Sequence, residues 1–391
     1  MVIRVGIIGL SAAATGTGWA AAAHLPYLLK SPHYEIVALC NSTVDNAKAA
    51  IKAFNLPPET RAYGSGEELA LDNDVDMVVA NTRVDLHGKV LLPSLRAGKT
   101  VFSEWPMDGN LKAAKEMLGA ARKSGSKTIV GLQGRANPVV QKVKQLVDEG
   151  RIGKVLSTHV FGFAGNGGAE EIAKIKYLVQ REVGGNMLTI HFVHSESDPF
   201  RLINIGLTIF VALDSILFSL GEIDTAQSLL KTQIPEVKII DGRDTKNYIE
   251  TIAKTTPDQI LLQATLKTGA VLSLHLQGGN APPFDPQHLW RIHGEKGSID
   301  VAADTFMLNI KTEGVKIRLY DGETGKVDNV SVDKDALDEL PVPARNIGRV
   351  YEAFVAEDKN FLVTFEDAFE RHKLLEKMLS QWDNRDQGWN L

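Results

Sequence analysis

The first 130 residues alternate short apolar runs with stretches of helical character, and this alternation limits the fold more than any other feature of the chain. The runs Val2–Leu10, Tyr34–Cys40 and Val75–Thr82 are too short to span a membrane and are typical of buried strands. Further runs begin at Thr100 and Thr128. Strands that alternate with helices predict a parallel, doubly wound sheet.

A turn rich in Gly and Ala joins the first strand to the first helix. It extends from Gly9 to Gly18, with Ser11 and Ala14 where the G-x-G-x-x-G pattern has its second and third glycines. Small residues here let the backbone approach a pyrophosphate at the helix N-terminus. We therefore predict a Rossmann dinucleotide-binding domain over residues 1–135. The residues expected to contact the dinucleotide here are Gly9, Ser11, Ala12 and Trp19.

The second strand ends in uncharged polar residues. Asn41 and Ser42 stand where an NAD-specific domain has an acid that binds the ribose 2′-hydroxyl. A neutral pair there tolerates a 2′-phosphate, so we expect both residues to contact the cofactor and NADP to be favoured over NAD.

The fourth strand leads into Glu104-Trp105-Pro106, at the sheet edge where doubly wound folds bind ligands. An indole has one N–H donor and no acid–base function. We expect Trp105 to stack on or wall off the nicotinamide or substrate pocket; the alternative is simple core packing. The residues expected around the nicotinamide end are Thr82, Arg83, His87, Glu104, Trp105 and Gln133.

From about residue 154 the pattern changes to strands with longer connections, which predicts an α+β domain over residues 136–391 with an open, mainly antiparallel sheet. Helical periodicity returns at residues 347–382, and we expect these helices to pack back towards the first domain. Thr364 has the character of a helix N-cap, followed by acids in the first turn. The predicted strands are Val155–Gly162, Gln259–Leu266, Val271–Gln277, Leu289–His293 and Phe306–Thr312.

Composition narrows the class of protein. The 391 residues carry a net charge of −5, which gives no reason to expect nucleic-acid binding. The single cysteine, Cys40, excludes an intramolecular disulfide and fits a reducing compartment. Asp214 interrupts the apolar run Leu202–Leu220 and favours a buried or interface helix over a membrane span. We expect no secretory signal, no metal site, and a cytoplasmic location, or a nuclear one for a regulator.

Six segments together resemble the glucose–fructose oxidoreductase/inositol dehydrogenase superfamily along nearly the whole chain. They are Gly6–Gly9, Val75–His87, Gly98–Pro106, Glu149–Lys154, His293–Gly297 and Thr364–Ala368. Within it, the chain most resembles the fungal branch that includes the yeast galactose-pathway repressor, a regulator that binds NAD(P). That likeness rests on Gly9–Ala13 followed by Gly18–Ala20, on Glu104-Trp105, and on Leu132–Arg135.

The resemblance implies active-site roles, and this sequence departs from several. Active members carry Glu-Lys-Pro, and Trp105 replaces that lysine. They also carry Gly-Gly, then an Asp and a His that exchanges the substrate proton; counting from Gly184-Gly185 gives Ile190 and His194. Counting back from Leu220-Gly221 instead gives Val211 for the His and Asp214 for an Asp one turn beyond it. Both counts hold only if residues 195–210 are an insertion, either an extra loop or a mis-spliced segment.

Three classes of function follow from these departures. The first is an NAD(P)-dependent oxidoreductase with a rebuilt site, acting on a small carbonyl, imine or sugar-like substrate. Its expected catalytic residues are His194, Glu104 and Arg135, with Arg135 holding an oxygen in a bidentate fork. The second is a cofactor-sensing regulator with a protein partner, and the third is a non-redox enzyme on the same fold. The resemblance also implies a homodimer formed through the open sheet.

Overall fold

The computed structural model describes residues 2–12, 18–165, 167–183, 188, 209–242, 247–305 and 312–383. Contacts divide the chain into two units. The first contains Met1–Gln133 and Asp335–Lys373, and the second contains Gly134–Lys334 and Leu374–Leu391. The domain boundary that the sequence places after residue 135 stays a prediction.

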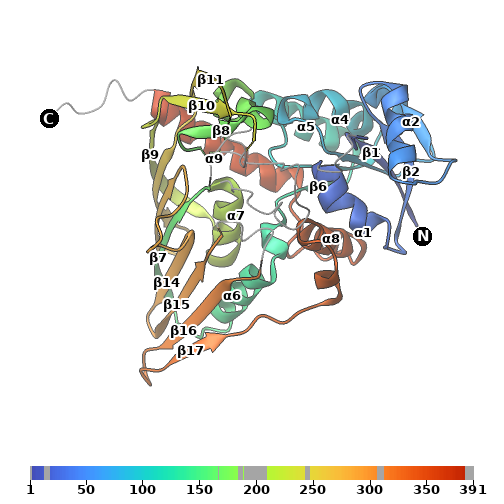
Figure 1. Ribbon diagram of the computed structural model, residues 1–391. Coiled ribbons are helices and arrows are strands. Elements are labelled where there is room, and N and C mark those ends of the chain that lie inside the picture. The colour runs from blue at the N-terminus through green and yellow to red at the C-terminus, as the bar shows by residue number, and fades with distance from the viewer. Residues whose placement is uncertain are drawn as a thin grey trace. The chain divides into compact units, whose positions relative to one another are not determined.

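A six-stranded parallel sheet forms the centre of the first unit, as the sequence predicts (Figure 1). Its strand order is β3-β2-β1-β4-β5-β6, so the order reverses between β1 and β4. Ligands of doubly wound sheets bind beyond the carboxyl ends of the strands at such a reversal. The strands are β1 (Ile3–Ile8), β2 (Tyr34–Cys40), β3 (Arg61–Tyr63), β4 (Met77–Ala80), β5 (Thr100–Ser103) and β6 (Thr128–Val130).

Helices cover both faces of this sheet. In Figure 1, α4 and α5 lie on one side, and α1 and α8 lie on the other. Helices α2, α3 and α5 begin at a side-chain cap, where Thr43, Ser65 and Asn110 each accept a backbone N–H of the first turn. The bounds are η1 (Ala20–His24), α1 (Leu25–Leu28), α2 (Val44–Ala53), α3 (Gly66–Ala70), η2 (Val84–Leu86), α4 (His87–Arg96), α5 (Leu111–Ser124), η6 (Ala336–Glu339) and α8 (Val342–Val355).

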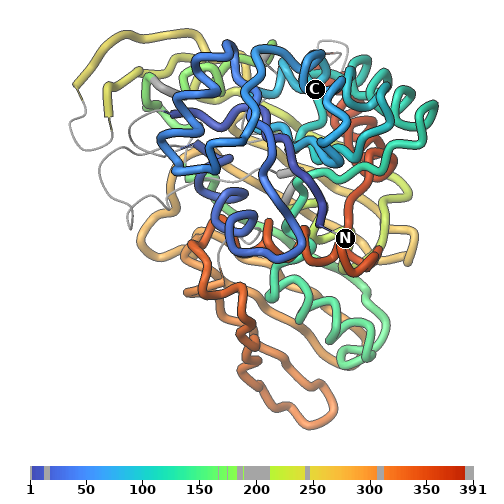
Figure 2. The backbone as a smooth tube through the Cα atoms, turned by 90° about the vertical axis from the view of Figure 1, so that its right-hand side faces the viewer, coloured from blue at the N-terminus to red at the C-terminus, as the bar shows by residue number. Residues whose placement is uncertain are grey.

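The segment after the second unit completes the first one. Helix α8, late in the sequence, packs on η1 and α1, which are early in the sequence, and Figure 2 shows these red and blue segments side by side. Helix α9 (Phe365–Asp383) follows. The hydroxyl of Thr364 accepts the N–H of Asp367, and the Asp367 carboxylate accepts the N–H of Thr364, which confirms the predicted cap.

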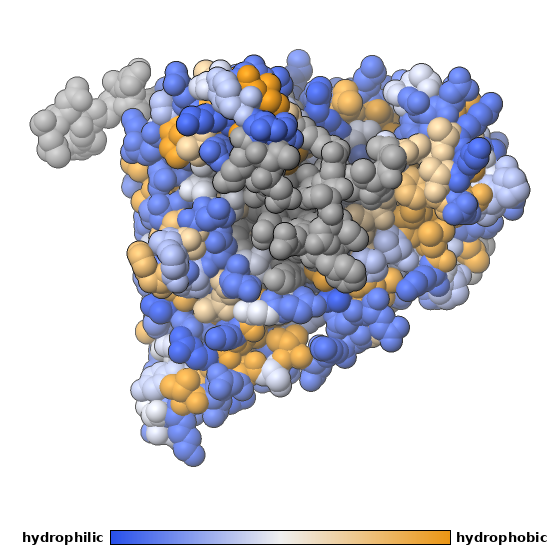
Figure 3. Space-filling view, viewed as in Figure 1, coloured by the Kyte–Doolittle hydropathy of each residue, from blue (hydrophilic) through white to orange (hydrophobic). Residues whose placement is uncertain are grey.

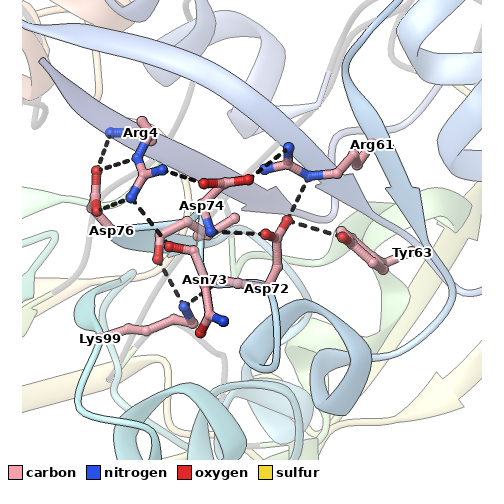
Figure 4. Close-up of polar contacts among 9 residues, drawn as sticks. Arg4, Arg61, Tyr63, Asp72, Asn73, Asp74, Asp76 and Lys99 are labelled. Carbon is pink, nitrogen blue, oxygen red and sulfur yellow. Dashed lines mark hydrogen bonds and ion pairs between the residues drawn. The ribbon is translucent and has the colours of Figure 1, made fainter.

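An ion-pair network lies at the amino ends of the strands (Figure 4). Arg4 of β1 donates through Nε and Nη2 to the carboxylate of Asp76, at 3.0 and 2.9 Å. The hydrogen bond from Arg4 holds the pKa of Asp76 below its ordinary value. Arg61 donates to Asp72, and Lys99 donates to the backbone carbonyls of residues 72 and 75. This network belongs to the edge opposite the expected ligand site and ties β1, β3, β4 and β5 together.

An eight-stranded sheet dominates the second unit, with the order β17-β16-β15-β14-β7-β13-β12-β9. Among the strands that the structure describes in this sheet, only β13 and β7 pair in parallel, so the predicted mainly antiparallel sheet is confirmed. Its strands are β7 (Val155–Phe163), β9 (Ile223–Lys231), β12 (Gln259–Leu266), β13 (Val271–Gln277), β14 (His288–Gly294), β15 (Gly297–Ala303), β16 (Val315–Asp321) and β17 (Val327–Val330). Residues 306–311 of one predicted strand lie outside the described residues.

The large sheet buries one face. Along β12, Ile260, Leu262 and Leu266 are buried, whereas Gln263 between them is exposed. Helices α6 (Pro138–Asp148) and α7 (Ile209–Leu220) lie on one side of the sheet (Figure 1). Asp214 is buried in α7, as predicted for this run, and no described helix is long and apolar enough to cross a membrane.

A small sheet and a buried ion pair complete the second unit. The sheet has the order β11-β10-β8, from β8 (Glu170–Ile172), β10 (Glu236–Ile240) and β11 (Tyr248–Ala253). After β11, Lys254 donates to Asp258 at 3.0 Å, and both side chains are completely buried. Asp258 also accepts the N–H groups of Gln233 and Ile234, and Lys254 donates to the carbonyl of Gly167. The short helices η4 (Ala173–Val179) and η5 (Arg181–Val183) follow β8.

Candidate functional site

Gly9 closes the first strand in a conformation that side chains avoid. Its φ is +91°, and a Cβ atom there would lie 2.6 Å from the carbonyl oxygen of Asn81. Its N–H donates to the carbonyl of Cys40, and the N–H of Asn81 donates to Ile8. The ends of β1, β2 and β4 therefore meet at this glycine, at the reversal of strand order.

Ser11, Ala12 and Trp19, the other residues predicted for the turn, lie before and after residues 13–17. Ser11 and Ala12 continue from β1 as coil, and residues 13–17 lie outside the described residues. Trp19 directly precedes η1. The described part of the turn thus brings Gly9, Ser11 and Ala12 to the carboxyl edge of the sheet.

Unsatisfied polar atoms gather at the same edge. Both polar atoms of the Asn81 amide, the Thr82 hydroxyl and Oε1 of Gln133 are buried, with no hydrogen-bond partner in the part of the chain that the structure describes. Asn81 and Thr82 directly follow β4, and Gln133 follows β6. Buried polar groups without partners are costly, so this set fits a ligand that carries amide, hydroxyl or phosphate groups. A nicotinamide dinucleotide carries all three.

Asn41 and Ser42, which are predicted to select between NAD and NADP, form hydrogen bonds to other residues of the chain. The Asn41 side-chain amide donates to the carbonyl of Leu10 at 2.8 Å. The Ser42 hydroxyl accepts the side-chain amide of Asn46 at 2.9 Å. Both side chains lie just after β2, beside the end of β1, and neither carries a charge.

Glu104 is the outermost member of a hydrogen-bonded chain. Its Oε1 lies 2.8 Å from Nε2 of His24, and Nδ1 of His24 lies 2.8 Å from the hydroxyl of Tyr351. His24 and Tyr351 are fully buried, whereas the Glu104 side chain keeps 15% of its surface exposed. Gly131 makes room for the carboxylate, because a Cβ there would lie 2.5 Å from its Oε2. The carboxylate thus stands at the carboxyl end of β5, partly open, with an imidazole and a phenol behind it.

Sequence reasoning missed two members of this chain. His24 and Tyr351 come from η1 and α8, 327 positions apart in the sequence. The local signal for His24 is an ionisable residue among alanines and leucines at the start of an apolar helix. No local signal marks Tyr351. Asn81, also missed, stands directly before the predicted residue Thr82.

Trp105 is buried in the first unit. Its ring contacts that of His372, with centroids 4.8 Å apart and planes inclined by 49°. His372 accepts the N–H of Met107, and burial lowers the pKa of His372 to about 4, with a smaller contribution from His87. His372 is therefore neutral near pH 7. Only 2% of the Trp105 surface is exposed, so protein groups surround the indole.

His87 and Arg83 contact nearby protein groups. The two ring nitrogens of His87 lie 2.9 and 3.0 Å from the carbonyls of Pro106 and Thr82, so His87 braces the loop after β5 against the one after β4. Arg83 is exposed and forms a bidentate pair with Asp85. Of the two, only Arg83 keeps a solvent-exposed polar group at this edge.

The guanidinium group of Arg135 binds the carboxylate of Asp214. Its Nε and Nη2 donate to the two oxygens of Asp214 at 2.8 and 2.7 Å, and both side chains are buried within the second unit. The bidentate geometry predicted for Arg135 is present, but the oxygens belong to Asp214 of α7 and not to a substrate. His194 lies outside the described residues, as do Gly184-Gly185, Ile190 and residues 195–208.

Comparison with known proteins follows the division into two units. Residues 3–132 match the oxidoreductase family with an NAD-binding Rossmann fold, and residues 138–303 match the Gal80p C-terminal domain. The galactose/lactose metabolism regulatory protein GAL80 of Saccharomyces cerevisiae is 31% identical over 312 residues, which cover 77% of this chain and 67% of that protein. The chain belongs to this oxidoreductase family. The predicted resemblance is thus confirmed, and the second unit is Gal80p-like.

The relatives include both a regulator and a dehydrogenase. Dehydrogenase aclE of Aspergillus oryzae is 27% identical over 379 residues, which cover 96% of this chain and 95% of that protein. A super-repressor mutant of Gal80p from Saccharomyces cerevisiae superposes with a TM-score of 0.82 at 25% identity, covering 97% of this chain and 96% of that one. Levoglucosan dehydrogenase in complex with NADH and L-sorbose shares the fold alone, with a TM-score of 0.71 at 17% identity over 97% of each chain.

Proposed function

We propose that this chain is an NAD(P)-dependent oxidoreductase whose site works without the lysine that Trp105 replaces. The observation that carries the proposal is the Glu104–His24 pair, which brings an acid–base couple to the carboxyl end of β5. Proton transfer by such a couple needs a carboxylate and an imidazole within hydrogen-bond reach. The alignment with aclE along 96% of the chain supports the same class.

Gly9, Ser11 and Ala12 would approach the pyrophosphate, with Trp19 at the start of the following helix. Asn81, Thr82 and Gln133 would satisfy their buried polar atoms on the ligand. When bound, the nicotinamide supplies or accepts the hydride. Glu104 would then hold or give the proton that a reduced carbonyl or imine needs, and His24 would restore it. His194 and Arg135 remain proposed members of the site, and Arg135 would have to leave Asp214 to bind a substrate oxygen.

Asn41→Asp is expected to move cofactor preference towards NAD by about tenfold, because a carboxylate repels the 2′-phosphate. The wild-type protein is expected to prefer NADP or to bind both nucleotides equally. Isothermal calorimetry with NAD, NADH, NADP and NADPH measures both proteins. Ser42→Ala, which adds no charge, is the control and is expected to change the preference by less than threefold. Binding of none of the four by the wild-type protein would sink the proposal.

A second candidate function is a cofactor-binding regulator without catalysis. Trp105 favours it, because an indole at this position offers no acid–base group. The 31% identity to a metabolism regulatory protein favours it as well. The chain covers 67% and 65% of the lengths of the two yeast regulatory proteins, so their partners are not carried over. A regulator would bind the nucleotide and show no turnover with any substrate.

Trp105→Lys is expected to create or raise dehydrogenase activity on sugar alcohols by at least tenfold if the lysine is the missing component. The activity is measured as NAD(P)H formation over a panel of sugars, beside wild-type consumption of NAD(P)H with carbonyls and imines. Trp105→Met supplies the control, a flexible side chain without charge. Turnover by the wild-type protein supports the enzyme. Absence of turnover in both proteins, with nucleotide binding retained, favours the regulator.

We also propose that the chain forms a homodimer through the large sheet. Leu229 on β9 and Val271 on β13 are about half exposed, and Figure 3 shows apolar patches along the left side, where Figure 1 labels β9. Exposed apolar side chains on one sheet face suit contact with a second copy of the chain. Static light scattering at micromolar concentration reads out the mass.

A further inference from the structure

We propose that Glu104, positioned by His24 and Tyr351, makes this chain bind the oxidised nicotinamide nucleotide more tightly than the reduced one. The inference rests on the proposed function, because it needs the nucleotide to occupy the edge where β5 ends. It goes beyond that function by assigning a preference between two redox forms of one cofactor to a named carboxylate.

Hydrogen-bond chemistry fixes the protons in the chain from Glu104 to Tyr351. An ionised carboxylate only accepts hydrogen bonds, so Nε2 of His24 carries the proton that lies between them. With that proton on Nε2, the arrangement that satisfies Nδ1 of His24 is a hydrogen bond donated by the Tyr351 hydroxyl. Burial raises the pKa of Tyr351 well above its ordinary value, which keeps that proton in place. The Glu104 carboxylate thus stands at the outer, partly exposed end of this chain, with an imidazole and a phenol behind it.

The groups packed around His24 and Tyr351 are aromatic side chains. Tyr34 of β2 donates to the carbonyl of Tyr351, and Tyr27 of α1 stacks on its ring. Burial raises the pKa values of both phenols, so each remains neutral near pH 7. Within the described residues, His24 is the one ionisable side chain that bonds to the Glu104 carboxylate. The next residue, Trp105, contributes an uncharged ring.

The two forms of the ligand differ in charge where Glu104 stands. The nicotinamide ring carries a positive charge when oxidised and none when reduced. A carboxylate beside it favours the oxidised form by an amount that depends on the local dielectric, about tenfold or more for a partly buried pair. Restraint by His24 and Tyr351 keeps the carboxylate from turning away, so little ordering entropy is lost when the ring binds.

Calorimetric dissociation constants for NADP and NADPH test the inference on the full chain at pH 8. The wild-type protein is expected to bind NADP at least tenfold more tightly. Glu104→Gln keeps the shape and an acceptor for His24 but removes the charge, and is expected to abolish most of this preference. Glu104→Asp keeps the charge and is expected to retain it. Glu116→Gln, on the exposed face of α5, is the matched control and is expected to change nothing.

Each result of these measurements either supports or overturns the inference. Equal affinity of the wild-type protein for both forms overturns the inference, whether or not the variants fold. An unchanged ratio in a folded Glu104→Gln, judged by its thermal unfolding, overturns it as well. A ratio that falls in Glu104→Gln and persists in Glu104→Asp supports it, because a purely structural role would weaken both nucleotides equally. Failure of the wild-type protein to bind any dinucleotide is distinct from these results and overturns the proposed function itself.

Discussion

Gly9→Ala is expected to destabilise the first unit by about 2–5 kcal/mol and to abolish dinucleotide binding. Alanine at a φ of +91° is strained before any contact is counted. Its Cβ would also lie 2.6 Å from the carbonyl oxygen of Asn81, and backbone atoms at the ends of two buried strands cannot move apart without breaking their ladder. The strain falls on the ends of β1 and β4, where the ligand is expected.

Gly119→Ala is the matched control for this change. Gly119 lies within helix α5, and the position that a Cβ would take there has open space around it, so alanine is expected to stabilise the protein by about 0.5–1 kcal/mol. Urea unfolding followed by circular dichroism measures both variants, and calorimetry measures nucleotide binding. Equal unfolding midpoints for the two variants would contradict the close approach at Gly9.

Asp258→Ala is expected to destabilise the second unit by about 3–5 kcal/mol. The substitution leaves the ammonium of Lys254 buried without its carboxylate, and it removes the acceptor of the Gln233 and Ile234 N–H groups. Burial already lowers the pKa of Lys254, so the orphaned amine is expected to lose its proton upon folding. Denaturant unfolding at pH 7 measures the loss.

Asp300→Ala serves as the control at a pair of comparable geometry. Asp300 accepts from Arg291 and Arg318, whose side chains are about half exposed, so its removal is expected to cost about 1 kcal/mol or less. The double variant Lys254→Met with Asp258→Leu removes both charges and is expected to be more stable than Asp258→Ala. A loss in Asp258→Ala no larger than that in Asp300→Ala would show that the buried pair is not a major stabilising contact.

The elements that the sequence predicts correctly are those with a local cause. Strand β12 alternates buried and more exposed residues with a period of two, and its predicted bounds match the structure. The Thr364 cap and the parallel sheet around Gly9 likewise depend on residues close together in the chain, or on a repeated pattern. Such local signals can be recognised in the sequence without knowledge of the tertiary contacts.

The parts of the site that depend on distant pairing could not be predicted in this way. The Arg135 guanidinium can bind a substrate oxygen, but its partner Asp214 lies 79 positions away in the sequence. The sequence pattern does not indicate which face of the Asp214 helix points towards Arg135. Glu104 stands where it is expected, whereas the imidazole that bonds to it comes from η1 and the phenol behind that from α8. Which charges neutralise one another is a property of packing, and packing is set by the whole chain.

The chain leaves the first unit at Gln133 and returns to it at Asp335, and this order has a consequence for synthesis. A ribosome makes about 200 residues of the second unit before it reaches α8, and during that time His24 has no Tyr351 to bind. The amino-terminal sheet is made first but its buried core is finished last. We expect a nascent chain that stops before α8 to expose the surface of η1 and α1 that α8 covers, including His24 and Tyr27, and such exposed surface favours binding by chaperones during translation.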